Sequence, residues 1–470
     1  MRKTKIVCTL GPGIDSEAAL RKLIVKGMNV ARINMSHGTQ EEQLVRINRV
    51  KAVREKYNSP VAILMDTKGP EIRIKSFKDG KIFLKEKDKF TLTTRDIEGD
   101  QSIVSITYKA MPQFVKPKNR ILINDGLIEL EVDEVAGDDI ICTVIDGGEL
   151  SNSKSINLPR IKIDMPYISD ADRKDLIFSC KNDVDYIALS FVRSADDVIQ
   201  VRKLVDENGG KDIQLIAKIE NREGVNNIDE ILEYADGIMV ARGDMGVEIP
   251  FVELPSIQKS LIRKCYQIGK KVITATQMLE SMIYNPRPTR AEISDVANAI
   301  FDGSSAIMLS GETAVGKYPF ETVKTMADIA EHAESSMNYK KLFNSLDVAV
   351  KTVTDAVSHS AVSASFDLGT KAIITVTQSG YTSRKVSRFR PSCAIIGATT
   401  NTKVFYQLAL NWGVVPVMAT MQENSDALFI HSVNCAKQTE IVKDGDLVVI
   451  IGSSKVGYSG NSDTLRIQTV

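Results

Sequence analysis

The chain has 470 residues, of which 43% are hydrophobic, so it can bury a large core and form two or three domains. Lysine and arginine together number 60, as do aspartate and glutamate, and the formal net charge is zero. This balance excludes a global basic field, so we expect no nucleic-acid or membrane partner and only local binding of phosphate groups.

The N-terminal residues 1–4 lead directly into a strand-like run, without the apolar segment of a secretory signal. No stretch reaches the ~20 consecutive apolar residues that a spanning helix needs. Six cysteines are scattered without a CxxC pair, which is typical of reduced thiols in protein cores. We therefore expect a cytoplasmic protein without disulfides or structural zinc.

Short apolar runs rich in β-branched residues alternate with amphipathic stretches, as in parallel strands joined by helices. The predicted strands cover residues 5–10, 30–35, 61–66, 186–191, 214–219, 237–241, 271–275 and 305–309. The predicted helices include residues 16–26, 40–56, 196–207, 254–268, 290–301 and 320–335. This α/β pattern predicts a (β/α)8 TIM barrel of residues 1–69 and 167–339, rather than an open doubly wound sheet.

Two regions depart from the barrel pattern. Residues 70–166 are rich in β-forming residues and turn signals and lack a clear amphipathic helix. Because about a hundred residues are too many for a structureless loop, we predict a β-barrel-like lid domain inserted after the third strand. Residues 340–470 return to alternation and predict a C-terminal α/β domain, with strands near 372–377, 394–398, 414–418 and 447–451.

Polar residues gather where the predicted barrel strands end, and barrel enzymes place their reactive groups at that end. Period-two alternation puts Arg32, Asn34 and Ser36 on one face of the second strand, and a buried arginine needs an anion. The other strand ends carry Asp66, Thr67, Lys218, Glu220, Asp244, Thr276 and Ser310.

Three of these residues form a candidate metal and oxyanion site. Glu220 and Asp244, expected on adjacent strands, supply two hard carboxylates and leave positions for water and substrate oxygens, as Mg²⁺ prefers. Lys218 lies two residues before Glu220 and should point the same way. An ammonium beside a metal suits stabilisation of an oxyanion, although a structural ion pair with one of the carboxylates is the alternative.

Several blocks along the chain resemble the signature motifs of the pyruvate kinase family. In chain order these blocks are residues 32–38 (Arg-Ile-Asn-Met-Ser-His-Gly), 66–73, 218–221 (Lys-Ile-Glu-Asn), 239–244, 274–279, 285–290 and 308–312. The resemblance runs in order through the whole chain. It implies transfer of a phosphoryl group between phosphoenolpyruvate and ADP in glycolysis, by a catalytic barrel with a closing lid, a C-terminal regulatory domain and a homotetrameric assembly.

The resemblance also implies roles for individual residues. Lys218 would stabilise the enolate oxygen, Glu220 and Asp244 would hold Mg²⁺ or Mn²⁺, and Arg32 and Arg73 would brace phosphate. The implied ligands of a monovalent cation, K⁺, are Asn34, Ser36, Asp66 and the carbonyl of Thr67. The implied contacts to the substrate carboxylate are the backbone of Ala241, Arg242, Gly243 and Asp244 and the hydroxyl of Thr276.

Further implications concern the nucleotide, the cation and the proton. Asn34, His37 and Arg73 would contact the nucleotide, whose adenine contacts stay open because Glu41 and Glu42 stand where some relatives carry an aromatic residue. Family members that work without K⁺ tend to carry lysine at position 71, so Glu71 implies a need for K⁺. The donor of the proton to the enolate stays open between Thr276, Ser310 and bound water, with water-relayed delivery favoured.

A loop in the C-terminal domain is a candidate effector site. A predicted strand runs into hydroxyl-bearing residues and glycine before a helix, which offers backbone N–H groups to an anion. The loop residues are Thr377, Gln378, Ser379, Gly380, Tyr381 and Thr382. They match the family's effector loop, and residues 456–462 resemble a second loop over the sugar phosphate. The effector's identity stays open, and an ordinary helix cap is the alternative.

Two rival functions remain at this point. Another barrel enzyme that handles phosphoenolpyruvate or pyruvate, such as a lyase or aldolase, could use the same metal-stabilised enolate, but the motif around Arg73 and the long lid argue against it. A binding protein that lost catalysis could keep the fold. Intact Lys218, Glu220 and Asp244 argue against the second rival.

Overall fold

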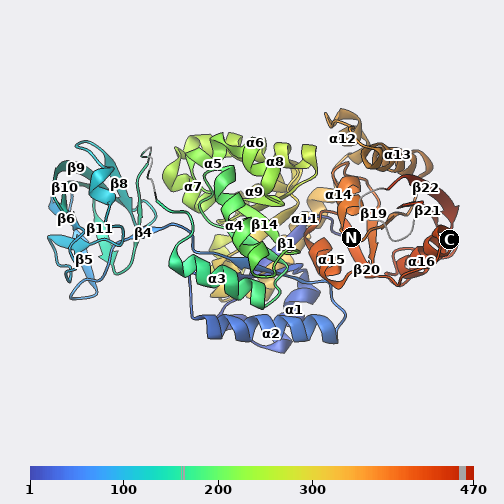
Figure 1. Ribbon diagram of the computed structural model, residues 1–470, viewed down its shortest axis with the longest axis horizontal. Coiled ribbons are helices and arrows are strands. Elements are labelled where there is room, and N and C mark those ends of the chain that lie inside the picture. The colour runs from blue at the N-terminus through green and yellow to red at the C-terminus, as the bar shows by residue number, and fades with distance from the viewer. Residues whose placement is uncertain (160, 162, 164, 455–461) are drawn as a thin grey trace.

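Three bodies lie in a row along the long axis of the molecule (Figure 1). The structure is a computed structural model that describes residues 1–470 except 160, 162, 164 and 455–461. The barrel occupies the centre, the inserted β-rich lid lies at one end, and the C-terminal domain lies at the other. The lid and the C-terminal domain therefore approach opposite ends of the barrel.

The central body is a closed barrel of eight parallel strands, which confirms the predicted fold class. Around the barrel these strands are β1 (Lys5–Thr9), β2 (Val30–Asn34), β3 (Ala62–Asp66), β13 (Tyr186–Leu189), β14 (Gln214–Ile219), β15 (Gly237–Ala241), β16 (Lys271–Ala275) and β17 (Ala306–Leu309). All eight lie where the sequence predicted them, with ends shifted by at most two residues. The fourth stops early, because Phe191 takes a left-handed backbone with φ of 56°.

Helices pack around the outside of the barrel. They are α1 (Glu17–Lys26), α2 (Gln40–Lys56), α3 (Asp170–Lys181), α4 (Ala195–Glu207), α5 (Arg222–Asn226), α6 (Ile228–Tyr234), α7 (Arg242–Glu248), α8 (Leu254–Ile268), α9 (Arg290–Phe301), α10 (Gly311–Ala314) and α11 (Pro319–Ser335). Side-chain caps fix several starts. The predicted helix 16–26 begins one residue later because Ser16 is its cap, and Thr39 and Thr289 each form a capping box.

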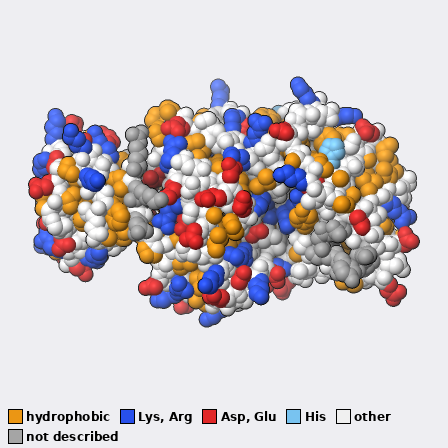
Figure 2. All heavy atoms as spheres, turned by 45° about the horizontal axis from the view of Figure 1, so that its top comes forward, with side chains coloured by type: hydrophobic (Ala, Val, Ile, Leu, Met, Phe, Trp, Pro, Cys, Tyr) orange, Lys and Arg blue, Asp and Glu red, His pale blue; other side chains and the backbone are white. Residues whose placement is uncertain are grey.

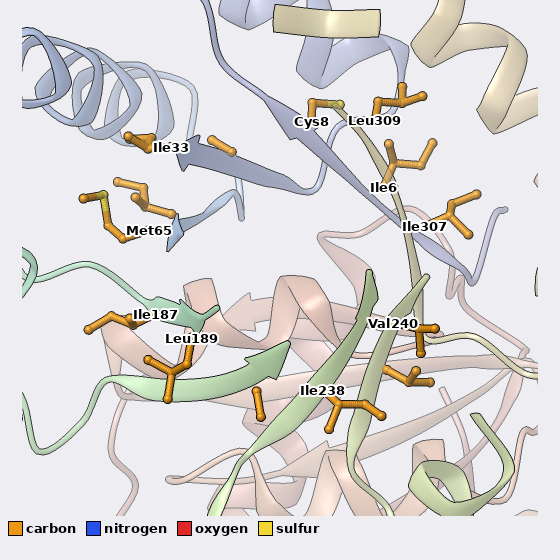
Figure 3. Packing of buried hydrophobic residues seen from close by; sticks show 14 of the residues in the cluster. Ile6, Cys8, Ile33, Met65, Ile187, Leu189, Ile238, Val240, Ile307 and Leu309 are labelled. Atoms are coloured by element: carbon orange, nitrogen blue, oxygen red, sulfur yellow. The ribbon is translucent and has the colours of Figure 1, made fainter. Parts of the chain in front are cut away.

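Strand alternation sorts the barrel side chains into two layers. Ile6, Ile33, Ile187, Ile238 and their neighbours point away from the barrel axis and pack beneath the helices (Figure 3). The alternate residues, among them Val7 and Leu64, fill the interior. Arg32, Asn34, Asp66 and Lys218 share the register of this inner set at the carboxyl ends of their strands. The packed interior thus supports a polar layer at one end.

The C-terminal domain closes the opposite end of the barrel. Ala409 and Leu410, in the 3₁₀ helix Leu408–Leu410, belong to the same apolar cluster as the barrel interior. The hydroxyl of Tyr186 donates to the carbonyl of Gln407 at 2.5 Å, and the amide of Gly413 donates to the carbonyl of Lys3 at 2.9 Å. The N-terminal end of the barrel is therefore a buried domain interface.

The lid is built from two β-sheets. Its strands are β4 (Ile72–Arg73), β5 (Lys81–Leu84), β6 (Lys89–Thr93), β7 (Ile103–Ser105), β8 (Arg120–Ile123), β9 (Ile128–Ala136), β10 (Asp139–Asp146), β11 (Gly148–Ser151) and β12 (Ser155–Asn157). Seven strands form one sheet in the order β4-β12-β8-β9-β10-β6-β7, and β5 pairs with β11. A bridge between Ile74 and Ile106 joins the two edges of the large sheet, which gives the lid its barrel-like form.

The C-terminal domain is a five-stranded sheet covered by helices. Its elements are α12 (Tyr339–Ser345), α13 (Val353–Leu368), β18 (Ala372–Val376), α14 (Tyr381–Ser387), β19 (Ala394–Thr399), α15 (Thr402–Gln407), β20 (Val414–Met418), α16 (Ser425–Lys437), β21 (Leu447–Gly452) and β22 (Thr464–Thr469). The sequence predicted its four parallel strands but missed β22, which adds antiparallel to β21. None of the residues of β22 is buried, and the segment lacks the apolar run of a buried strand.

The surface carries mixed charge. Figure 2 shows acidic and basic side chains interspersed over the visible face of all three bodies, in keeping with the zero net charge. Among the described residues, no helix combines the length and apolar composition needed to cross a membrane.

Candidate active site

A cavity of about 670 Å³ lies between the lid and the carboxyl ends of the barrel strands. Arg32, Lys218 and Glu220 line it from the barrel, and Arg73 and Lys154 line it from the lid. Both bodies thus contribute cationic groups to one cavity. Such a space suits a ligand with several anionic oxygens.

A compact group of charges forms the floor of this cavity. The ammonium of Lys218 lies 3.0 Å from Oε1 of Glu220 and 3.1 Å from Oδ1 of Asp66, and it donates to the hydroxyl of Ser190 at 2.6 Å. Asp66 and Glu220 are fully buried. The predicted shared direction of Lys218 and Glu220 agrees with this geometry, and so does the alternative of an ion pair. The oxyanion site and the structural ion pair are therefore both consistent with the same contacts of Lys218.

Arg32 is fixed so that part of its guanidinium stays available. Its Nε donates to Asp66 at 2.6 Å, and its Nη1 donates to the hydroxyl of Thr9 at 2.9 Å. Among the described residues, Nη2 has no acceptor, although Arg32 is 92% buried and lines the cavity. A guanidinium held at one edge and open at the other can receive a phosphate oxygen.

The electrostatics of the floor decide which groups are charged. The pKa of Glu220 is raised to about 8, chiefly by burial and also by the charge of Asp244, against the opposing effect of Lys218. Burial alone would lower the pKa of Lys218, but Asp66 and Glu220 hold it above its ordinary value. Burial would raise the pKa of Asp66, yet Arg32 and Lys218 bring it below the ordinary range. Both shifts favour the charged forms, the protonated ammonium of Lys218 and the ionised carboxylate of Asp66.

Glu220 and Asp244 fit a divalent cation. Glu220 receives the amide of Phe191 on Oε2 at 2.6 Å, while Oε1 is buried without a hydrogen bond. Asp244 lines the cavity and has no hydrogen bond or ion pair to any described residue. Within that part of the chain no cluster of three or more His, Cys, Asp or Glu side chains exists, so substrate oxygens and water would complete the coordination.

Asp244 reaches the site from a helix, which corrects the expectation that it ends a strand. Strand β15 stops at Ala241, and residues 242–244 form the first turn of α7. The turn directs Arg242 away from the cavity, where it pairs with Asp295 at 2.7 Å and donates to the carbonyl of Thr276 at 2.6 Å. Only the backbone of this turn is available to a substrate carboxylate, and within it the amide of Gly243 already donates to the hydroxyl of Thr276 at 2.8 Å.

Thr276 and Ser310 lie beside the cavity but not among the residues that line it. Thr276 has a positive φ of 68°, and its hydroxyl donates to the carbonyl of Ala275 at 2.6 Å and accepts the amide of Gly243 at 2.8 Å. The hydroxyl oxygen of Ser310 is buried without a hydrogen-bond partner in the described chain. Thr276 therefore braces the first turn of α7, whereas the hydroxyl of Ser310 makes no hydrogen bond within the described chain.

The four predicted K⁺ ligands meet at the junction of β2 and β3. Asn34 is the cross-strand partner of Asp66, and Thr67 follows directly. Ser36 lies in the turn after β2 and is exposed, so strand alternation does not explain its direction as predicted; instead its amide donates to Oδ1 of Asn34 at 3.0 Å. The carbonyl of Thr67 accepts the hydroxyl of Ser190 at 2.6 Å. These oxygen donors suit a monovalent cation.

The predicted nucleotide contacts Asn34, His37 and Arg73 all line the cavity. Glu71 holds the guanidinium of Arg73 through two contacts of 2.8 Å, to Nε and to Nη2. Nη1 donates to the carbonyl of Ser153 at 2.5 Å. This fork positions Arg73 at the hinge of the lid, where one strand of the lid begins.

The sequence analysis missed two residues of this site. Ser190 follows β13 in the inward register and touches both Lys218 and Thr67, and inspection of that strand end would have found it. Lys154, in the turn before β12, lines the cavity from the lid. A turn lysine carries no sequence signal of that position, because only the fold brings the turn to the barrel.

The candidate effector loop joins β18 to α14, in the predicted order of strand, loop and helix. Thr377 and Thr382 are buried, and the hydroxyl of Thr382 lies 2.6 Å from that of Ser462. Helix α14 has only seven residues, and Lys385 pairs with Asp355 at 3.0 Å. Of the six loop residues, Gln378 and Ser379 face a separate hollow of about 470 Å³ against the barrel, while Gly380 and Tyr381 begin the turn into α14. Residues 456–461 of the second loop lie outside the described chain.

Comparison with known proteins agrees with this geometry. Residues 1–323 match the family model "Pyruvate kinase, barrel domain", and residues 355–468 match "Pyruvate kinase, alpha/beta domain". Curated pyruvate kinases of Clostridium acetobutylicum and Clostridium perfringens are 48% and 46% identical to the chain, each over the full length of both proteins. A pyruvate kinase of Geobacillus stearothermophilus is 47% identical over all of this chain and 80% of its own length. The chain therefore belongs to the pyruvate kinase family, as its motifs predicted.

Proposed function

We propose that the cavity between barrel and lid transfers a phosphoryl group from phosphoenolpyruvate to ADP, giving pyruvate and ATP, as a step of glycolysis in the cytoplasm. The observation that carries this proposal is the buried ammonium of Lys218, held at 3.0 Å and 3.1 Å from two carboxylates and open to a space lined by further cations. Phosphoryl transfer asks the protein mainly for positioning and charge compensation.

The two arginines would position the phosphoryl group. Arg32 offers its free Nη2 from the barrel, and Arg73 approaches from the lid with its fork fixed by Glu71. Because one belongs to the barrel and the other to the lid, closing the lid would bring both to the same oxygens. Closure would also exclude water, which would otherwise accept the phosphoryl group.

Lys218 would stabilise the enolate left when phosphorus departs. Its charge is secured by Asp66 and Glu220, and its direction is set by Ser190, so it is ready before negative charge develops on the substrate oxygen. A preorganised charge of this kind contributes most in the transition state. The backbone of residues 241–244, braced by Thr276, would hold the substrate carboxylate.

Two cations would complete the site, in line with the general requirement of the pyruvate kinase family for a divalent and a monovalent cation. Glu220 and Asp244 would hold Mg²⁺ or Mn²⁺, which when bound neutralises charge on the substrate oxygens. Asn34, Ser36, Asp66 and Thr67 would hold K⁺, which adds positive charge near the phosphates. The positions of Glu220 and Asp244 support this assignment, because both carboxylates line the same cavity and Asp244 has no hydrogen bond or ion pair to any described residue.

Water-relayed delivery is our proposal for the proton that reaches the enolate carbon. The hydroxyl hydrogen of Thr276 is already committed to the carbonyl of Ala275. Ser310 has a free hydroxyl but does not line the main cavity. Both residues could orient a water molecule without acting as the acid themselves.

The first prediction concerns Lys218→Met. Because the ammonium acts mainly as the enolate forms, kcat should fall by at least ~10²-fold while binding of phosphoenolpyruvate changes little. The measurement is formation of pyruvate coupled to lactate dehydrogenase, with ATP quantified in parallel. Lys87→Met, at a lid lysine whose side chain is 85% exposed, is the matched control and should behave as wild type.

Turnover of Lys218→Met within a few-fold of wild type would contradict the role of Lys218. If the wild-type protein formed no ATP from phosphoenolpyruvate and ADP, the proposed reaction itself would be wrong. Release of pyruvate without ATP would point instead to the lyase-like alternative.

The second prediction concerns the monovalent cation. Glu71 is a carboxylate paired with Arg73, so position 71 supplies no ammonium near Asn34 and Asp66 that could replace the cation. The protein should therefore need K⁺ to balance the charge of the substrate phosphates. We expect activity in KCl and a loss of most activity in tetramethylammonium chloride at the same ionic strength. Undiminished activity with the bulky cation would refute the requirement.

We further propose that the loop 377–382 binds a phosphorylated sugar as an activator and that the protein assembles as a homotetramer. The support for the effector is the cluster of hydroxyls on Thr377, Ser379 and Thr382, with Thr382 bonded to Ser462 of the second loop. The tetramer rests on the family resemblance. Sedimentation should give four times the chain mass of 51.8 kDa, and a monomer would contradict it.

The third prediction tests the effector loop with the double variant Ser379→Ala and Thr382→Ala. A panel of sugar phosphates should include one that shifts the half-saturation of wild type for phosphoenolpyruvate by ~5–150-fold, the range for 1–3 kcal/mol of coupling. The double variant should lose the shift and keep its unactivated kinetics, whereas Ser335→Ala, on an exposed helix end, should keep both. Activation that survives in the double variant would show that the loop is not the effector site.

A further inference from the structure

A small cavity lies at the interface between the N-terminal end of the barrel and the C-terminal domain, at the opposite end of the barrel from the active site. Its volume is about 20 Å³, which is room for one water molecule or one ion of similar size. The charged side chains that line it are all cationic, namely Lys270, Lys271, Arg384, Arg388 and Arg390. No carboxylate lines it, so charge alone favours an anionic occupant.

Some of these cations form an ion pair or a hydrogen bond with nearby groups. Arg388 lies 3.1 Å from Asp355, and Lys270 donates to the carbonyl of Ala235 at 2.7 Å. Lys271 donates to Oε1 of Gln214 at 2.6 Å. Within the described chain, however, neither Lys271 nor Arg384 nor Arg390 has a carboxylate within the 4.0 Å limit of an ion pair. At least three charges at this interface thus lack a counter-ion.

Arg390 has two buried donor atoms without a hydrogen-bond acceptor among the described residues. It is 95% buried, and its guanidinium lies over the ring of Trp412 at 4.4 Å from the centroid. Nη2 donates to the carbonyl of Gly303 at 2.6 Å, but Nε and Nη1 are buried without any acceptor among the described residues. A buried unsatisfied donor typically costs ~1–3 kcal/mol, and more when it is charged. Two such donors on one side chain indicate a missing acceptor.

Neighbouring polar groups from both domains could share that acceptor. The barrel residue Ser305 accepts the amide of Val272 at 3.2 Å, and its own hydroxyl hydrogen is free within the described chain. Nε of Arg388 is also buried without a partner. Asn411, whose Oδ1 is unpaired, could present its NH2 group to the same space by turning over its amide. An anion here would therefore join the barrel to the C-terminal domain.

The shifted pKa values agree with uncompensated positive charge. Burial, together with the nearby guanidinium of Arg384, lowers the pKa of Lys271 to about 7. Burial lowers the pKa of Arg390 to about 10. A bound anion would oppose both effects by favouring the charged forms.

We propose that this cavity, between Arg390 and Trp412 of the C-terminal domain and Lys271 and Ser305 of the barrel, binds one halide-sized inorganic anion. Chloride suits the space, whereas phosphate and sulfate exceed it. A neutral water molecule is the competing occupant, since it would also accept from Arg390. The two occupants differ in whether other halides displace them, and this difference makes the proposal testable.

The chain supplies its own probe, because Trp412 is its single tryptophan and forms one wall of the cavity. Bromide quenches tryptophan fluorescence through its heavy-atom effect. Titration of the wild-type protein with potassium bromide, balanced by potassium gluconate at constant ionic strength, should give saturable quenching. Chloride should relieve that quenching by competition, and gluconate should not. Quenching that rises linearly with bromide and ignores chloride would overturn the proposal.

A substitution and a direct observation complete the test. Arg390→Lys keeps a charge but removes the fork of donors, so the saturable quenching should disappear. Arg466→Lys, at a partly exposed arginine on β22, is the control and should retain it. Crystals soaked in bromide should show an anomalous peak beside Arg390, and a water molecule there without anomalous signal would refute the site. This observation needs no variant, so it decides the matter even if Arg390→Lys fails to fold.

Discussion

The active end of the molecule depends on one arrangement, the ammonium of Lys218 held between the buried carboxylates of Asp66 and Glu220. Burying three charges is costly unless each has a partner, and Arg32 supplies the fourth by pairing with Asp66. The network keeps Lys218 positive and engages Nε and Nη1 of Arg32, while Nη2 has no acceptor among the described residues. Arg32 and Asp244 both line the cavity, so Arg32 can receive an anionic ligand there and Asp244, beside Glu220, can bind a cation.

The barrel makes this arrangement possible and the other two bodies use its ends. Strand alternation sends Arg32, Asp66 and Lys218 inward at the carboxyl ends, above an interior filled with apolar side chains. The lid adds Arg73 and Lys154 to that end, while Ala409 and Leu410 of the C-terminal domain seal the other. Both ends of the barrel thus bury cations at an interface. At the active end carboxylates balance most of them, and at the C-terminal domain the balance is incomplete around Arg390.

The sequence predicted the barrel, the β-rich insertion and the last domain, because hydrophobic period is a local property that eight strands repeat. It failed where a neighbouring element decides. Strand β22 has no buried residue and forms by pairing with β21, and Asp244 lies on a helical turn rather than a strand. Motif resemblance placed Lys218, Glu220 and Arg32 at one site. It gave no sign of Ser190, whose contacts with Lys218 and Thr67 depend on the position of β13 between β14 and β3.

Titration of Lys218 would show whether Asp66 and Glu220 keep its side chain charged. Protein labelled with ¹³C at lysine Cε would report each ammonium by its chemical shift, with the Lys218 signal assigned from Lys218→Arg. The account predicts that this signal stays in its protonated position at pH values where ordinary lysines, with a pKa near 10.5, have begun to titrate. A Lys218 signal that titrates below pH 10.5 would show that burial outweighs the carboxylates, and would contradict this role of Asp66 and Glu220.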